Sequence, residues 1–177
     1  GSLAMYALKD AIGEDRVNLA LRNLIAEWGF KEGLFPTSMD LIAEFRAVAG
    51  PEHQELITDL FEKIVIYDVR VADTDVVEVD GGFEVTMTVE AAKFEADGAG
   101  QDTEVQLDQL LDVAVFARDT EELGDDDLPP ALHFEQLRIT GGEQTFTFTV
   151  SEQPGRVGID PYVKMIDRNP DDNVKYL

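Results

Sequence analysis

Side chains that carry oxygen atoms crowd the C-terminal stretch DRNPDDN. This stretch holds Asp167, Asn169, Asp171, Asp172 and Asn173. Oxygens at the first, third and fifth positions are typical of a calcium loop, but Asp172 stands where such loops have glycine, and the closing glutamate would fall beyond Leu177. Asp and Asn side chains also bind nearby backbone N–H groups in turns, and Pro170 fixes the local conformation. We therefore favour a hydrogen-bonded turn over a cation site.

The histidines and serines do not complete a known catalytic pattern. A zincin helix needs two histidines four positions apart with a glutamate beside the first, whereas His53 and His133 lie far apart in the sequence. We expect His53 to be an exposed residue of a first helical turn and His133 to have a structural role at the start of a strand. No serine lies in a G-x-S-x-G context, and the chain has only Ser2, Ser38 and Ser151. The sequence thus predicts no catalytic, cofactor-binding or metal-binding residue in this chain.

The charge balance limits the classes of partner. The 37 acidic residues outnumber the 14 basic ones, which gives a formal net charge of −23. Nucleic acids and anionic membrane surfaces are poor partners, because both are held by clustered Lys and Arg. Cation binding, a basic protein partner or simple solubility remain as interpretations. The chain has no cysteine, which excludes disulfides, thiolate nucleophiles and cysteine zinc sites.

Two further stretches have simple structural interpretations. The acidic segment DTEELGDDDL, residues 119–128, is expected to be a solvated loop. Trp28, Phe30 and Phe35 form either an exposed aromatic patch or part of a core, and we favour core packing. No apolar run reaches the roughly 18–20 residues of a membrane-spanning helix. The first residues also lack the basic and apolar pattern of a signal peptide.

The elements that position these residues change type near Lys63. Apolar residues recur at steps of three and four from residue 3 to about residue 64, which predicts four short helices. Gly13 and Gly29 are expected to end the first two helices. Thr37 and Asp40 have the spacing of a capping box at the start of the third, and Pro51 suits the first turn of the fourth.

From residue 64 onward, apolar and polar residues alternate with the period of a strand. Glycine pairs at 81–82 and 141–142 predict hairpin turns. The stretch from residue 104 to 118 is expected to be a strand with a bulge or a short helical turn near Leu107. The whole pattern predicts an α+β chain, with a bundle of about four short helices (1–63) followed by an antiparallel β-sandwich of six or seven strands (64–177).

Three stretches carry a resemblance to a known family. MYALKDAIGEDRVNLALRNLIAE, at residues 5–27, resembles the helices just after the catalytic tyrosine of bacterial zinc aminopeptidases of the membrane alanine aminopeptidase (gluzincin) family. Residues 37–71 resemble the closing helices of the same catalytic domain. Residues 142–173, above all GIDPY and IDRNPDDN, resemble the end of the β-sandwich that follows it, as in bacterial members joined to transporter-permease-like membrane segments.

This resemblance implies a non-catalytic role for the chain itself. The family's HExxH motif, its downstream glutamate ligand and its Gly-x-Met-Glu-Asn motif have no match here and would lie upstream of Gly1, as would the catalytic tyrosine. Tyr6 lies within a helix beyond that position and does not take its role. The resemblance implies that zinc and peptide substrate are bound by the upstream part of a parent protein, and that the remainder of that peptidase is this chain's partner.

The resemblance also bears on localisation and on alternatives. It implies a soluble segment of a bacterial, membrane-associated parent with an extracytoplasmic peptidase region, and no membrane insertion by the segment itself. In this interpretation the chain supports the peptidase domain structurally. The alternatives are an acidic β-sandwich module that binds calcium or a basic protein, and a degenerate parent that acts as a scaffold beside a transporter.

Overall fold

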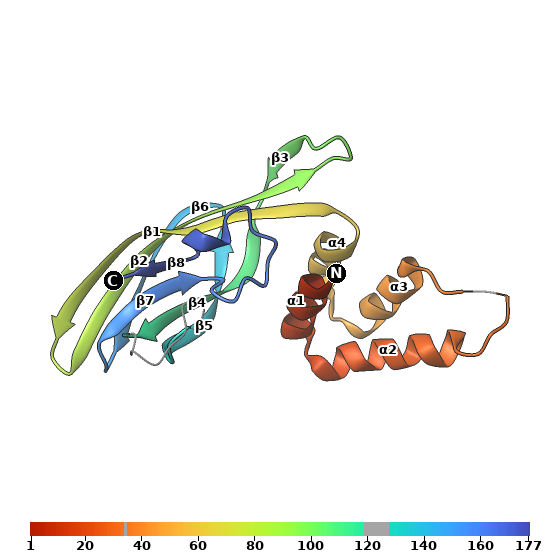
Figure 1. Cartoon of the computed structure of the whole chain (residues 1–177), viewed down its shortest axis with the longest axis horizontal. Helices are drawn as coiled ribbons and strands as arrows, with labels where there is room; N and C mark the ends of the chain where they lie inside the picture. Colours follow the sequence, from red (N-terminus) through yellow and green to blue (C-terminus); the bar gives the residue numbers. More distant parts are fainter. Residues whose placement is uncertain (34, 119–127) are drawn as a thin grey trace. The chain divides into compact units, whose positions relative to one another are not determined.

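The computed structural model describes residues 1–33, 35–118 and 128–177, and the chain divides into two compact units. The helical unit comprises residues 1–65 together with residues 96–99. The β-unit comprises residues 66–95 and 100–177. The predicted α+β class, with N-terminal helices followed by an antiparallel sandwich, is confirmed (Figure 1).

The helical unit contains the four predicted helices. They are α1 (Ser2–Ile12), α2 (Glu14–Trp28), α3 (Ser38–Val48) and α4 (Gln54–Phe61), with the 3-10 turn η1 (Pro51–His53) before the last. Their apolar stripes meet in one core because each helix alone leaves such a stripe exposed to water. This core is formed by Leu8, Ile12, Val17, Ala20, Ile42, Phe45 and Ile57.

The predicted helix ends are confirmed where local chemistry determines them. Gly13 follows α1 with φ of 89°, a left-handed conformation that favours glycine. At the start of α3, Asp40 Oδ2 accepts hydrogen bonds from the Thr37 backbone N–H at 2.7 Å and from its hydroxyl at 2.8 Å. These bonds lower the pKa of Asp40, the backbone bond being the larger cause.

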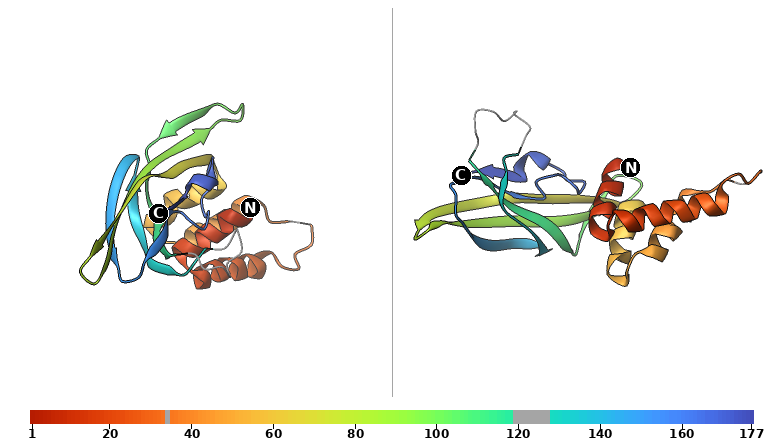
Figure 2. Two further views of the ribbon diagram at one scale, coloured as in Figure 1. Left: turned by 60° about the vertical axis from the view of Figure 1, so that its left-hand side comes forward. Right: turned by 90° about the horizontal axis from the view of Figure 1, so that it is seen from below.

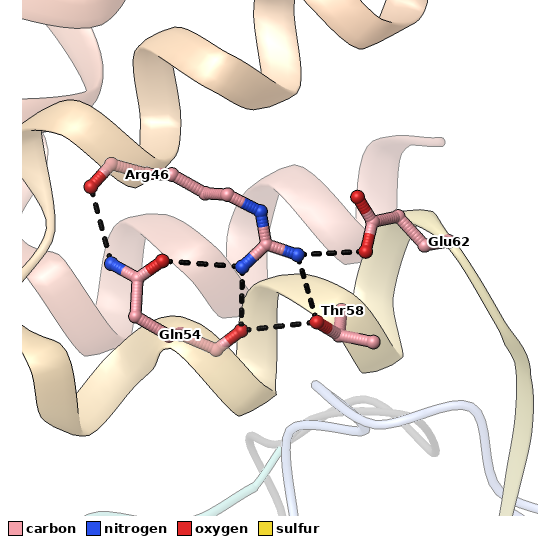
Figure 3. A network of polar contacts seen from close by, with 4 residues as sticks. All are labelled: Arg46, Gln54, Thr58 and Glu62. Carbon is pink, nitrogen blue, oxygen red and sulfur yellow. Dashed lines mark hydrogen bonds and ion pairs between the residues drawn. The ribbon is translucent and has the colours of Figure 1, made fainter.

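Arg46 clamps α3 to α4 across the turn that begins at Gly50 (Figure 3). Its guanidinium donates to Gln54 O and Oε1, both at 3.1 Å, to Thr58 Oγ1 at 2.8 Å and to Glu62 Oε2 at 2.7 Å. The Gln54 amide donates back to Arg46 O at 3.1 Å. The planar fork of arginine suits such multiple acceptance, so one side chain fixes the angle between the two helices.

Among the described residues, the β-unit consists of two sheets that together hold eight strands, rather than six or seven. In the first sheet β2 (Gly82–Ala96) lies next to β1 (Ile64–Val79) and also pairs with β3 (Asp102–Val105) and β6 (Gly142–Val150). The second sheet has the order β5 (Ala131–Thr140), β4 (Asp108–Ala117), β7 (Pro154–Ile159) and β8 (Val174–Tyr176).

The two sheets of the β-unit lie one over the other (Figure 2), and the inward-facing residues of their strands are buried between them. Val85, Met87 and Val89 of β2 are fully buried, as are Val113 and Val115 of β4. On the outer face of the first sheet, β2 and β6 pair threonines across the ladder. The hydroxyls of Thr86 and Thr147 lie 3.2 Å apart, and those of Thr88 and Thr145 lie 3.0 Å apart. The alternation read from the sequence therefore assigned the faces of these strands correctly.

The prediction of one strand from residue 104 to 118 is wrong. The chain leaves the first sheet after β3 and enters the second as β4, so that the stretch is two strands in different sheets. Leu107, between them, is 1% exposed, and its carbonyl accepts a hydrogen bond from Gly141 N at 3.3 Å. The connection between the two sheets is buried at Leu107. The sequence therefore contains no polar turn residues that would mark the place where the chain changes sheet. The hairpin predicted at Gly141 and Gly142 is also wrong, because β5 and β6 on either side of these glycines belong to different sheets and do not pair with each other.

Candidate functional site

The acidic C-terminal stretch forms the turn network predicted for it. Asp167 accepts from Asn169 N at 2.7 Å and from Val69 N at 3.1 Å. The Asn169 amide donates to Asp172 Oδ2 at 2.7 Å, across the 3-10 turn η2 (Pro170–Asp172). Asn173 is fully buried and donates to Asp160 O at 3.3 Å. Within the described ranges, no group of three or more acidic or histidine side chains is arranged to hold a metal ion.

The same stretch connects the edges of the two sheets. Ile166 O accepts from Tyr67 N, and Arg168 N donates to Tyr67 O, both at 2.8 Å, so the segment adds a short parallel bridge to β1. Farther along, β8 pairs with β7, and Lys175 Nζ donates to Ala72 O at 2.7 Å. We call residues 160–176 the C-terminal strap.

A buried cluster of charged groups lies at the start of the strap. The Lys164 ammonium lies 2.5 Å from Asp112 Oδ2, and both side chains are less than a tenth exposed. Asp112 Oδ1 accepts from the Gln136 amide at 3.1 Å. Asp160 is 1% exposed, and its two carboxyl oxygens accept from Lys164 N at 3.0 Å and from Met165 N at 2.9 Å. We call Asp112, Asp160 and Lys164 the buried charge cluster.

Burial raises the pKa of Asp160 to about 6. Desolvation is the largest cause, and the two backbone N–H groups oppose it because they favour the ionised form. Nearby Asp112 raises the pKa further, whereas Lys164 lowers it. The pKa of Asp167 in the strap is also raised, again chiefly by desolvation.

The backbone around this cluster is strained. Asp160 has φ of 43° and Val163 has φ of 48°, in the left-handed region. A β-branched residue such as Val163 rarely adopts this conformation, and each such residue costs about 1–3 kcal/mol. The strap therefore holds a tight turn that its hydrogen bonds and buried ion pair must stabilise.

A perturbed carboxyl beside a lysine is a feature of many active sites, but a catalytic group must reach its substrate. Here Asp112, Asp160 and Lys164 are all buried. A separate open hollow of about 310 Å³ is lined by Arg118, Gln153, Pro154, Gly155, Tyr176 and Leu177, and it contains none of the three. The buried charge cluster is therefore best interpreted as a structural lock for the strap.

Exposed apolar side chains gather along residues 25–39 of the helical unit. Phe30 is fully exposed, Phe35 is 83% exposed, Ile25 65% and Met39 59%. The expectation that Phe30 and Phe35 pack in a core is wrong, because both side chains are exposed to solvent. Phe30 also has φ of 63°, which is unfavourable for a bulky residue. Trp28, at the end of α2, is partly buried, and Lys31 Nζ lies 4.9 Å from the centre of its ring.

We call Ile25, Trp28, Phe30, Phe35 and Met39 the apolar loop surface. Exposed apolar side chains that lie together mark interaction sites more often than scattered ones do, and these five fall between residues 25 and 39 of the sequence. This surface is the candidate functional site. The sequence signal for it was the aromatic content of the connection between α2 and α3, which was assigned to a core.

The remaining candidate residues lie apart from one another in the sequence. His53 is partly buried rather than exposed, with Nε2 3.4 Å from Glu52 Oε1. The His133 ring packs against Phe148, with centroids 4.5 Å apart. Tyr6 is an exposed residue of α1. Residues 119–127 of the predicted acidic loop lie outside the described residues.

The three serines occupy the ends of elements. Ser2 begins α1, Ser38 begins α3, and Ser151 follows β6.

No family model matches this chain, and comparison with curated proteins finds no significant relative. Over the residues that the structure describes, no helix combines the length and the apolar character needed to cross a bilayer.

Proposed function

We propose that this chain is the non-catalytic C-terminal part of a larger zinc aminopeptidase-like protein, and that it attaches to the peptidase part through the apolar loop surface. The observation that carries the proposal is the exposure of Ile25, Phe30, Phe35 and Met39 on a helical unit that has a complete core of its own. The parent is proposed to bind zinc and peptide upstream of Gly1, and to be a membrane-associated bacterial protein with an extracytoplasmic peptidase region.

Docking would bury apolar side chains that are exposed to water in this chain. Moving one large apolar side chain from water into a packed interface contributes about 1.5–3 kcal/mol. The backbone of Phe30 is in an unfavourable conformation, and its ring is exposed to water. Contact with water does not offset the cost of this conformation, whereas contact with a partner would. A rigid neighbour matters to a metal peptidase, because its ligands must be held in place by the structure behind them.

The isolated chain is expected to release no amino acid from aminoacyl p-nitroanilides, with or without added zinc. An extended protein that includes the in-frame sequence upstream of Gly1 is expected to show chelator-sensitive release. In the extended protein, Phe30→Ser with Phe35→Ser is expected to lower the thermal midpoint, because the docked contact is lost. The same pair of changes in the isolated chain is expected to have little effect.

Trp28 reports on docking independently of activity, because it is the only tryptophan of this chain. If the upstream sequence contains other tryptophans, they are replaced by phenylalanine for this measurement. Trp28 emission is expected to shift to shorter wavelength and to be less quenched by acrylamide in the extended protein. Val77→Ser with Val79→Ser, which changes exposed residues of β1, is the matched control. Chelator-sensitive hydrolysis by the isolated chain, or unchanged Trp28 quenching in the extended protein, contradicts the proposal.

A second candidate is a binding module for a basic protein or for calcium, and the net charge of −23 favours it. A lysine-rich peptide is expected to bind at low salt and to dissociate as salt screens the attraction. Millimolar calcium is expected to raise the thermal midpoint if a site binds only the folded chain. If the peptide binds equally well at high salt, the chain is not a module for a basic protein. If calcium leaves the thermal midpoint unchanged, the chain is not a calcium-binding module.

A further inference from the structure

One sheet edge of the β-unit lacks the usual protection against strand pairing. Natural proteins protect edge strands by making them short, charged or bulged, or by covering them. The edge of β1 carries the bridge from the C-terminal strap, and β3 and β8 have only four and three residues. At the other edge of the second sheet, β5 carries Glu135 and Arg138 and lies opposite a bulge of β4.

β6 differs from these edges. It pairs with β2 over nine consecutive residues without a register shift, and no other described strand pairs with it. Its sequence, GEQTFTFTV, contains one charged residue, Glu143, and neither lysine nor proline. Such a long, regular and nearly uncharged edge is a template for another strand. We propose that β6 pairs antiparallel with β6 of a second copy of this chain, forming a two-fold dimer with a continuous sheet.

The near absence of charge on β6 allows a second copy to be the occupant despite the net charge of the chain. Two molecules of net charge −23 repel each other, so they can associate only where little charge is brought together. In a two-fold pairing centred on Phe146, all nine residues of β6 overlap. Glu143 then lies opposite Thr149 of the second copy and not opposite its own equivalent.

The side-chain pattern fits the same register. Thr145, Thr147 and Thr149 face solvent, whereas Phe148 and Val150 face the core. Centring the pairing on Phe146 places Thr145 opposite Thr147 of the second copy. The solvent-facing sides of the two β6 strands then lie on the same side of the continuous sheet. This extends the threonine pairs that already join β6 to β2. Phe146, which is partly exposed at the edge, meets its own equivalent, and aromatic cross-strand pairs are favourable.

Sedimentation analysis of the full chain tests the proposal. A dimer is expected to form as the concentration of the chain is raised to about 0.5 mM. Its dissociation constant is expected to fall as salt increases, because salt screens the repulsion between the two copies. Thr145→Lys with Thr147→Lys places lysines opposite lysines and is expected to weaken association at least about tenfold. Thr86→Lys with Thr88→Lys adds the same charge to the same face of β2, away from the edge, and is expected to leave dimerisation within about threefold of the parent chain.

Charge exchange and cross-linking test the register. Mixing the lysine variant with Thr145→Glu, Thr147→Glu is expected to restore association, because each lysine then meets a glutamate. The absence of cysteine allows a simple second test, in which Thr145→Cys and Thr147→Cys chains are mixed and mildly oxidised. The mixed disulfide is expected to exceed either homodimer. A parent chain that stays monomeric, equal weakening by the β2 variant, or preferential homodimer cross-links would overturn the proposal.

Discussion

Replacing Lys164 by methionine is expected to destabilise the β-unit by about 3–5 kcal/mol at pH 7, which is a large share of the stability of a domain of this size. The change keeps most of the side-chain volume but removes the ammonium that lies 2.5 Å from Asp112 Oδ2. Asp112 and Asp160 would then both be buried without a cation, and the lost hydration of an unpaired buried carboxylate is not replaced by the protein interior. Urea unfolding, followed by a spectroscopic signal that arises from the β-unit, measures the loss in its free energy of unfolding.

The double variant Lys164→Met, Asp112→Asn separates the loss of the ion pair from the loss of packing. The side-chain amide oxygen that it introduces at position 112 still accepts from Gln136, while the uncompensated charge is gone. The double variant is therefore expected to regain at least half of the lost stability. If Lys164→Met alone costs less than about 1 kcal/mol, the ion pair is not the lock of the strap.

Acidification from pH 7 to pH 4.5 is expected to stabilise the β-unit, by a contribution from Asp160 of about 2 kcal/mol. The pKa of Asp160 is about 6 in the folded chain against 3.8 for an ordinary aspartate. The folded state therefore binds this proton first as pH falls through 6, and the unfolded state binds it only near 4. The gain is full below the unfolded pKa and is lost as pH rises through the folded pKa. The raised pKa of Asp167 acts in the same direction.

Thermal midpoints between pH 7.5 and pH 4.5 measure this dependence. Asp160→Asn is expected to flatten it, because the asparagine side chain does not titrate. Asp171→Asn, at an exposed position of the same strap, is the matched control and is expected to keep the dependence of the parent chain. The depressed pKa values of Glu14 and Asp40 belong to the helical unit and act at lower pH. A midpoint that falls steadily from pH 7 to pH 5, or equal slopes for the two variants, contradicts the assignment to Asp160.

The sequence predicted those parts of the fold that neighbouring residues determine. The helices are set by apolar spacing within a few turns, and the Thr37 and Asp40 pair determines its cap within one turn. The passage from β3 to β4 is different, because Leu107 lies between two runs of similar composition and only the second sheet decides where the chain turns. Periodicity reports which face of a strand is buried and does not report which sheet contains it.

The candidate sites show the same division. The hydrogen bonds of Asp167 and Asn169 are largely local, and the turn was predicted from residue types alone. Asp112 and Lys164 come from separate segments that only the strand order brings together, so no spacing in the sequence marks their ion pair. For Phe30 and Phe35, hydrophobicity predicts burial in some apolar environment. It does not distinguish a core of the same chain from a surface that another protein covers.

The strap also sets the order in which the molecule can be made. Lys175 and Ala72 are hydrogen-bonded although 103 positions separate them, and the bridge to Tyr67 spans a similar length of chain. During synthesis, β1 leaves the ribosome long before residues 160–176 are translated, so its edge stays uncovered until those residues emerge. The core of the helical unit, by contrast, is formed within the first 61 positions and is available to fold early. Folding of the β-unit is thus complete only after the strap has been made, and contacts of such long range fold slowly.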